Sequence, residues 1–192
     1  DQEINKIKNK PKKDISAWDE YMQGLNIRNN NQNTSEIRDK IMNHCKKAID
    51  LDANFCDAYI LYCGCLTMEI YDPNKTEERN DNERLYLTLS EKAVSLDPEN
   101  PLALDCLGHY YRITNNIDKS HEIMEKTFNL NPNHPQSIFS YGFSLAQFKK
   151  FDEALKLINK AIEIDPYSKK NYESILCWIY IGLKDWENAL FW

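Results

Sequence analysis

Glycine is scarce in this sequence, and a strand-like pattern is missing. Five glycines are scattered among 192 residues, so the chain has no glycine-rich loop of the kind that cradles a phosphate. No segment alternates apolar and polar residues as a half-buried strand does, although 42% of the residues are hydrophobic. These features favour an all-α protein with enough residues to bury a sizeable core.

The chain also lacks a long apolar run and an excess of basic residues. No run approaches the roughly 18 apolar residues of a membrane span, and no segment resembles a signal peptide, so we expect a cytoplasmic protein with no membrane partner. The 24 basic side chains are outnumbered by 30 acidic ones, which argues against nucleic acid as a partner because phosphate binding needs a basic face. The one basic stretch, KIKNKPKK within residues 1–14, is interpreted as a linker.

Motifs for catalysis and metal binding are missing as well. The four histidines share no HExxH spacing, and no serine or cysteine lies in a nucleophile motif such as GxSxG. The six cysteines include a CxC at Cys63 and Cys65, but there is no CxxC pair and no second cluster at zinc spacing. All six fit the helical pattern, which favours reduced thiols packed between helices. We expect no enzyme activity, no metal site and no cofactor.

What the sequence does contain is one amphipathic helix that occurs four times. The four copies are EIRDKIMNHCKKAIDLDA (36–53), ERLYLTLSEKAVSLDP (83–98), NNIDKSHEIMEKTFNLNP (115–132) and FKKFDEALKLINKAIEIDP (148–166). Segments 101–134 and 135–168 have 34 residues each and align without a gap. A fixed period of this length is the signature of a helical repeat protein, in which each unit buries the apolar face of its neighbour.

The two 34-residue segments carry small residues and prolines at matching positions. These are Gly108 and Gly142 at position eight, Ser120 and Ala154 at position twenty, and Pro132 and Pro166 at position thirty-two. Small residues let two helix backbones approach closely, so we expect Gly108 to face Ser120 and Gly142 to face Ala154. The prolines end the helices that precede them.

This pattern resembles the tetratricopeptide repeat. The resemblance implies an all-α fold, a right-handed superhelix of antiparallel helix pairs whose first helices line a concave groove. We place the unit starts at residues 15, 56, 101, 135 and 170, so that residues 15–192 form the repeat domain and the last unit is truncated. In the second unit a polar insertion, DPNKTEERNDN (72–82), separates the two predicted helices.

The layout of the chain also resembles a narrower group. The motif AWDEYMQGL (17–25), an irregular long unit, an insertion and then regular repeats resemble the region that follows the signalling domain of bacterial adenylate cyclases, winged-helix regulators and kinases. Two functions are therefore open. The first is a protein–protein interaction module that binds a peptide segment or partner domain in its groove. The alternative is a sensory or regulatory domain of a signalling enzyme or transcription regulator.

Family positions that face the groove give the candidate binding residues. In the second half of the chain these positions hold Asp105, His109, Arg112, Phe139, Phe143, Trp178 and Ile181. An apolar patch beside a charge can anchor a peptide by burying side chains and fixing its orientation. The aromatic residues either contact such a partner or pack between adjacent first helices. The apolar end of the chain, ALFW (189–192), predicts self-association through that end.

Overall fold

The computed structural model describes residues 16–167 and 172–191, and over these ranges the protein is helical with no strand. Ten helices follow one another: α2 (Ala17–Asn30), α3 (Ser35–Leu51), α4 (Cys56–Ile70), α5 (Arg79–Leu96), α6 (Pro101–Ile113), α7 (Ile117–Leu130), α8 (Pro135–Gln147), α9 (Phe151–Ile164), α10 (Glu173–Gly182) and α11 (Trp186–Phe191). The predicted all-α repeat fold is confirmed. The basic linker at 1–14, the unit starts at 15 and 170, and Trp192 lie outside the described residues.

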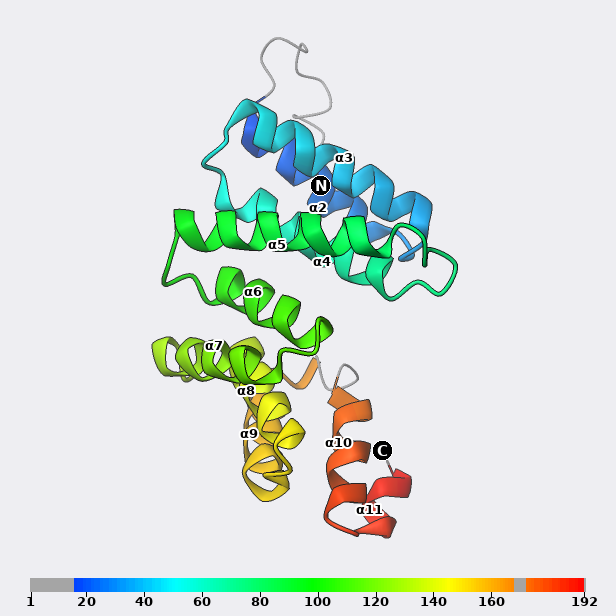
Figure 1. The fold of residues 1–192 in the computed structure, drawn as a ribbon, viewed down its shortest axis with the longest axis vertical. Helices are drawn as coiled ribbons and strands as arrows, with labels where there is room; N and C mark the ends of the chain where they lie inside the picture. Colours follow the sequence, from blue (N-terminus) through cyan, green and yellow to red (C-terminus); the bar gives the residue numbers. More distant parts are fainter. Residues whose placement is uncertain (1–15, 168–171, 192) are drawn as a thin grey trace. The chain divides into compact units, whose positions relative to one another are not determined.

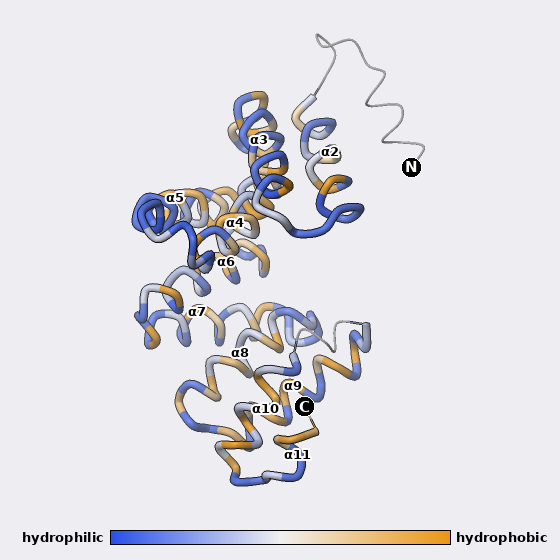
Figure 2. Tube along the Cα trace, turned by 90° about the vertical axis from the view of Figure 1, so that its right-hand side faces the viewer, coloured by the Kyte–Doolittle hydropathy of each residue, from blue (hydrophilic) through white to orange (hydrophobic). Residues whose placement is uncertain are grey.

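The helices form antiparallel pairs in chain order (Figure 1). The chain divides into two compact units, one ending at Pro98 with helices α2 to α5, the other starting at Glu99 with helices α6 to α11. Within each unit every helix packs against the helices before and after it in the sequence. Apolar and polar residues alternate along the helices, as expected when each helix buries one face (Figure 2).

Helix starts in the second unit are set by short local signals. Asn100 caps α6, because its side-chain oxygen accepts hydrogen bonds from the backbone N–H groups of Leu102 and Ala103 at 3.0 and 3.3 Å. Pro101 then occupies the first turn, where a missing N–H costs nothing. At α8 the ring of His134 caps in the same way, followed by Pro135.

The turns within the helix pairs of the second unit share one backbone conformation. Asn115, Lys149 and Lys184 have φ values of 60°, 61° and 59°. In each turn the following N–H donates to a carbonyl five residues back, for example Lys150 to Leu145 at 3.0 Å. This Schellman-type closure satisfies carbonyls at the helix end and reverses the chain in a few residues.

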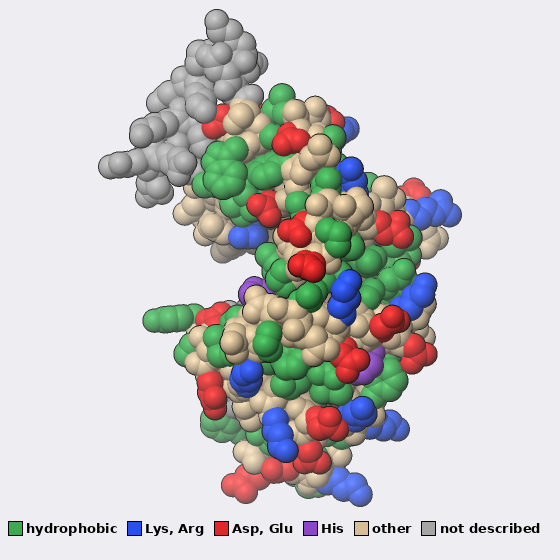
Figure 3. All heavy atoms as spheres, turned by 90° about the vertical axis from the view of Figure 1, so that its left-hand side faces the viewer, with side chains coloured by type: hydrophobic (Ala, Val, Ile, Leu, Met, Phe, Trp, Pro, Cys, Tyr) green, Lys and Arg blue, Asp and Glu red, His purple; other side chains and the backbone are tan. Residues whose placement is uncertain are grey.

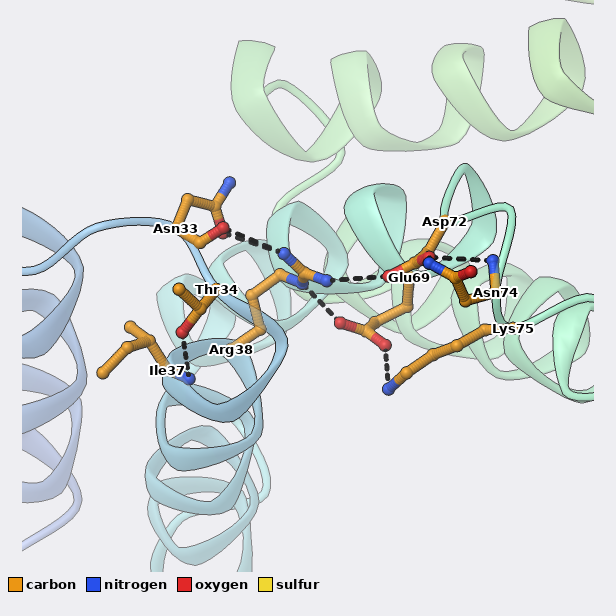
Figure 4. A network of polar contacts seen from close by, with 8 residues as sticks. All are labelled: Asn33, Thr34, Ile37, Arg38, Glu69, Asp72, Asn74 and Lys75. Atoms are coloured by element: carbon orange, nitrogen blue, oxygen red, sulfur yellow. Dashed lines mark hydrogen bonds and ion pairs between the residues drawn. The ribbon is translucent and has the colours of Figure 1, made fainter.

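The connection between α4 and α5 in the first unit is longer and is held by buried charges (Figure 4). Arg38 of α3 and Glu69 of α4 are only 7% and 2% exposed, and they form an ion pair. The other carboxylate oxygen of Glu69 pairs with Lys75 in the connecting segment. Arg38 also reaches the carboxylate of Asp72 at 3.5 Å and the backbone oxygen of Asn33 at 3.2 Å. The network therefore ties the connecting segment to two helices.

Two details differ from the sequence-based expectations. Helix α5 begins at Arg79, inside the predicted polar insertion, where Arg79 and Glu83 form an ion pair at 3.0 Å one helical turn apart. A Cβ atom at Gly142 would lie 3.4 Å from the Ala154 oxygen, as expected of facing small residues. The nearest side chains are nevertheless Ile158 and Leu157 at Gly142, and the equivalent Met124 and Ile123 at Gly108, so each glycine lies closest to side chains one turn beyond the expected small residue.

Candidate functional site

A cavity of about 210 Å³ lies within the second unit. Its lining comes from three helices: Asp105, His109 and Arg112 of α6, Ser120 and Met124 of α7, and Gln136, Phe139, Ser140, Phe143 and Ser144 of α8. The spacing of three and four residues places each set on one helix face. Five of the seven candidate residues thus meet in one cavity, whereas Trp178 and Ile181 of α10 do not line it.

Asp105 is engaged with the neighbouring first helix rather than with open solvent. One of its oxygens accepts a short hydrogen bond from the Ser140 hydroxyl, and the other accepts one from the Gln136 amide at 3.3 Å. Burial raises the pKa of Asp105, and these two hydrogen bonds and the charge of Arg112 oppose the rise. Asp105 therefore joins α6 to α8, and its oxygens already have partners.

His109 lies one turn further along α6 and is neutral at physiological pH. Burial, together with the nearby positive charge of Arg112, lowers the pKa of His109 to about 3. A neutral imidazole has one N–H donor and one acceptor nitrogen. His109 can thus form hydrogen bonds in the cavity without adding charge to it.

Arg112 supplies the positive charge of the cavity. Its Cζ atom lies 4.7 Å from the centroid of the Phe143 ring, which is cation–π geometry. None of the ion pairs found among the described residues includes Arg112. The guanidinium is therefore held against a ring while its charge lacks a paired carboxylate within the described part of the chain.

Ser120 is a cavity residue that the sequence analysis assigned only to helix packing. Its side chain is 1% exposed, and its hydroxyl oxygen has no hydrogen-bond partner within the described ranges. A buried polar atom without a partner is unfavourable and rare in folded proteins. The polar face of α8 was missed too, although the i, i+4 spacing of Gln136, Ser140 and Ser144 indicated it.

The aromatic candidates pack between helices and also contribute to the candidate binding surface. Phe139 stacks on Tyr172 at 4.5 Å between centroids, and Phe143 lies 6.0 Å from Trp178. Both phenylalanines pack against the core formed by α8, α9 and α10 and also line the cavity. Trp178 and Ile181 remain 39% and 45% exposed. Packing alone thus accounts for the two phenylalanines better than for Trp178 and Ile181.

The described residues hold no group of three or more histidine, cysteine or acidic side chains placed to bind a metal ion. None of the six cysteines, all of which lie in the described ranges, forms a disulfide. No helix in the described ranges is both long and apolar enough to cross a membrane.

Comparison with known proteins identifies the fold. Residues 79–161 match the family model described as anaphase-promoting complex, cyclosome, subunit 3. A tetratricopeptide protein of Thermus thermophilus superposes with a TM-score of 0.68 at 13% identity, over 92% of this chain and 82% of that one. The chain has a tetratricopeptide-type repeat fold.

Two further structures have the same tetratricopeptide-type fold. MamA superposes with a TM-score of 0.59 at 21% identity, over 87% of this chain and 89% of that chain. MamA of Desulfovibrio magneticus RS-1 superposes with a TM-score of 0.56 at 15% identity, over 90% of both chains. No curated protein matches the sequence. Helical repeat proteins of this kind present extended concave surfaces for binding.

Proposed function

We propose that the second unit of this tetratricopeptide-type protein binds a segment of a protein partner. The contact surface comprises the cavity and the exposed face of α10, with Asp105, His109, Arg112, Phe139, Phe143, Trp178 and Ile181 as its residues. The observation that carries the proposal is Arg112, whose charge has no paired carboxylate in the described ranges and which lies on a ring of the cavity wall. An oriented cation beside apolar surface can fix a peptide segment in one direction.

The apolar side chains supply the area that such a contact would bury. Phe143 joins the two parts of the surface, because it lines the cavity and also contacts Trp178. Trp178 and Ile181 lie one turn apart on α10 and are both exposed. Burying apolar area contributes about 25 cal/mol per Å², and tryptophan is enriched among residues that dominate interface energies.

A protein segment suits the charge of the chain better than nucleic acid. The net charge is −6, and on the face drawn in Figure 3 acidic and basic side chains are interspersed without a basic stripe. Phosphate backbones are bound by clustered lysine and arginine, and a single cavity arginine does not provide such a surface. In this proposal residues 15–192 form one repeat domain and residues 1–14 are its linker.

A sensory role is the second candidate, and the size of the cavity favours it. A space of about 210 Å³ with one cation suits a small anionic ligand as well as a side chain. Such a ligand would act by changing the packing of α6, α7 and α8, and so bias a signalling domain joined to this chain. Saturable binding of a small carboxylate, with no binding of any peptide, would favour this role.

Self-association through α11 is a further part of the proposal, with a second copy of this chain as the partner. Trp186, Leu190 and Phe191 are 61%, 89% and 74% exposed. Figure 2 shows this last helix ending in hydrophobic residues. Apolar side chains gathered at one end of a repeat protein favour contact with another apolar surface.

Peptide selection from a random displayed library against the immobilised protein tests partner binding. A selected peptide is then titrated calorimetrically against Trp178→Ala and against Trp18→Ala. The two tryptophans are matched, because Trp18 is 48% exposed on the first helix of the other unit and also contacts other aromatic rings. We expect Trp178→Ala to weaken binding by about 1–3 kcal/mol, as hot-spot truncations do.

Trp18→Ala should leave the affinity unchanged. Equal losses for the two variants, or a loss confined to Trp18→Ala, would contradict the assignment of binding to the second unit. Failure of the selection to yield any peptide with saturable binding would contradict the proposed function itself.

A further inference from the structure

The cavity offers its hydrogen-bond donors to an anion and not to a cation. Among the lining residues that the structure describes, Asp105 is the only acidic one, and both of its oxygens accept hydrogen bonds from α8. Arg112 lines the same space and belongs to none of the ion pairs among the described side chains, although its charge also acts to lower the pKa of Asp105. An added cation would be repelled by Arg112, whereas an added carboxylate would complete its charge pairing.

The position of Arg112 on Phe143 orients its donors. A guanidinium that lies over an aromatic ring keeps its N–H groups in its own plane, where they can still bind a carboxylate with two parallel hydrogen bonds. The ring also restricts the arginine side chain before a ligand arrives. Less conformational entropy is then lost on binding.

Ser120 is the second, independent observation. Ser120 lines the cavity from α7, and its buried hydroxyl has no partner among the residues that the structure describes. A hydroxyl donor near a bound carboxylate would satisfy this atom. The neutral imidazole of His109 adds no competing charge.

The apolar part of the lining suits the stem of an acidic side chain. Met124, Phe139 and Phe143 line the cavity together with the polar groups. A glutamate buries two methylene groups behind its carboxylate, so it can contact the apolar wall and the arginine together. A volume of about 210 Å³ has room for one such side chain but not for a folded element.

We infer that the cavity binds one acidic side chain, glutamate or aspartate, from within the partner segment, with Arg112 as the ion-pairing residue and Ser120 as a second donor. This inference rests on the proposed function and specifies the chemistry of its ligand. The bound side chain would be an internal residue of the partner, so the partner's terminal carboxylate is not required.

A first experiment needs no identified partner. N-acetyl-glutamate amide, which carries only a side-chain carboxylate, is titrated into isotopically labelled protein and followed by NMR at the Arg112 Nε–H and the Ser120 amide. N-acetyl-glutamine amide is the uncharged control, and N-acetyl-leucine presents a terminal carboxylate instead. We expect saturable shifts with the glutamate probe alone, and their loss in Arg112→Gln.

Arg28→Gln is the matched protein control, because Arg28 also lies in the last turn of a first helix, in the other unit. It should leave the shifts unchanged. Equal shifts with the glutamine probe, survival of the shifts in Arg112→Gln, or no saturable shift with any probe would overturn the inference. If N-acetyl-leucine alone bound, the cavity would recognise a terminal carboxylate and not an internal acidic side chain, and the inference would be wrong.

The second experiment uses a peptide from the selection. Changing its acidic residue to the amide should weaken binding roughly ten- to a hundredfold, the range for hydrogen bonds to charged groups. The same change should have no further effect against Arg112→Gln. A peptide that binds without any acidic residue would overturn this inference and leave the proposed function intact. Failure of all peptides while the glutamate probe binds would overturn the proposed function and favour the sensory role.

Ser120→Ala tests the second donor. The substitution should weaken binding of the acidic peptide by about two- to tenfold. It should leave the unfolding midpoint of the free protein unchanged or raised, because it removes an unsatisfied buried hydroxyl. Ser90→Ala is the control, since Ser90 is equally buried on a second helix but donates to the Leu87 oxygen at 3.0 Å. If Ser120→Ala binds the acidic peptide as tightly as wild type does, Ser120 is not a donor to the bound side chain.

Discussion

The guanidinium of Arg112 lies over the ring of Phe143, with its Cζ atom 4.7 Å from the ring centroid. The two residues belong to the first helices of successive pairs, α6 and α8. Phe143 also contacts Trp178 of α10 at 6.0 Å between centroids. One phenylalanine therefore links the charged part of the candidate surface to its exposed apolar part.

Replacing this ring while keeping apolar volume separates binding from packing. We expect Phe143→Leu to weaken binding of a selected peptide by about 0.5–2 kcal/mol, because the cation–π contact with Arg112 and the ring contact with Trp178 are lost. The free energy of unfolding should fall by less than about 1.5 kcal/mol. Phe128→Leu is the control, since Phe128 also has a cation over its ring, Lys160 at 6.0 Å, but does not line the cavity. Equal effects on affinity would contradict the role of Phe143.

The low pKa of His109 predicts a loss of stability in mild acid. The pKa is about 3 in the folded protein and roughly 6.5 in an unfolded chain, so between these values the unfolded state binds the extra proton. This contribution to stability is fully present above pH 6.5 and is lost as the pH falls, with a slope of at most about 1.4 kcal/mol per pH unit. Chemical denaturation of wild type and His109→Gln at pH 7 and pH 5 measures it.

The variant should lose less stability than wild type between these two pH values. In NMR spectra the His109 ring should show no titration between pH 7.5 and 4.5. A ring that titrates near 6.5 would contradict the burial of His109 as the cause of its low pKa.

Glycine at the turn position of α8 and α9 should stabilise the protein. Lys149 has φ of 61°, a conformation that costs a side-chain-bearing residue roughly 1–2 kcal/mol. Glycine avoids this cost but loses more chain entropy on folding, which cancels part of the gain. We expect Lys149→Gly to raise the free energy of unfolding by about 0.5–1 kcal/mol. Asn115→Gly should gain less, because asparagine tolerates this conformation. Lys156→Gly, in the exposed middle of α9, should instead cost about 1 kcal/mol.

The buried charges of the first unit should be sensitive to the loss of one partner. Arg38→Leu leaves Glu69 buried with Lys75 alone, and we expect a loss of about 3–5 kcal/mol in unfolding free energy. Lys40→Leu removes an exposed ion pair with Glu36 on the same helix and should cost less than about 0.5 kcal/mol. Similar costs for the two variants would show that the buried network adds nothing to stability.

Polar substitution of the last helix tests self-association. Leu190→Ser combined with Phe191→Ser removes two exposed apolar side chains and should shift the protein toward monomer in sedimentation velocity at high concentration. Leu51→Ser is the control, because Leu51 is 56% exposed at the end of α3 in the other unit. A monomeric wild-type protein, or equal shifts in both cases, would rule out association through α11.

The helices and their order could be predicted from the sequence because their signals are local. Asn100 and Pro101 mark a helix start by satisfying or removing backbone N–H groups within a few residues. The recurring amphipathic pattern requires each helix to bury one face, which predicted the repeat fold without any knowledge of long-range contacts. The resemblance to the layout of bacterial signalling proteins stays a prediction.

Contacts between distant residues were decided only by the tertiary structure. Family positions brought Asp105, Arg112 and Phe143 together as candidates, but the partnerless hydroxyl of Ser120 and the ion pair of Arg38 with Glu69 had no signal in the sequence. Such contacts depend on how closely two helices cross and on which rotamer each side chain adopts, and neither is determined by local spacing.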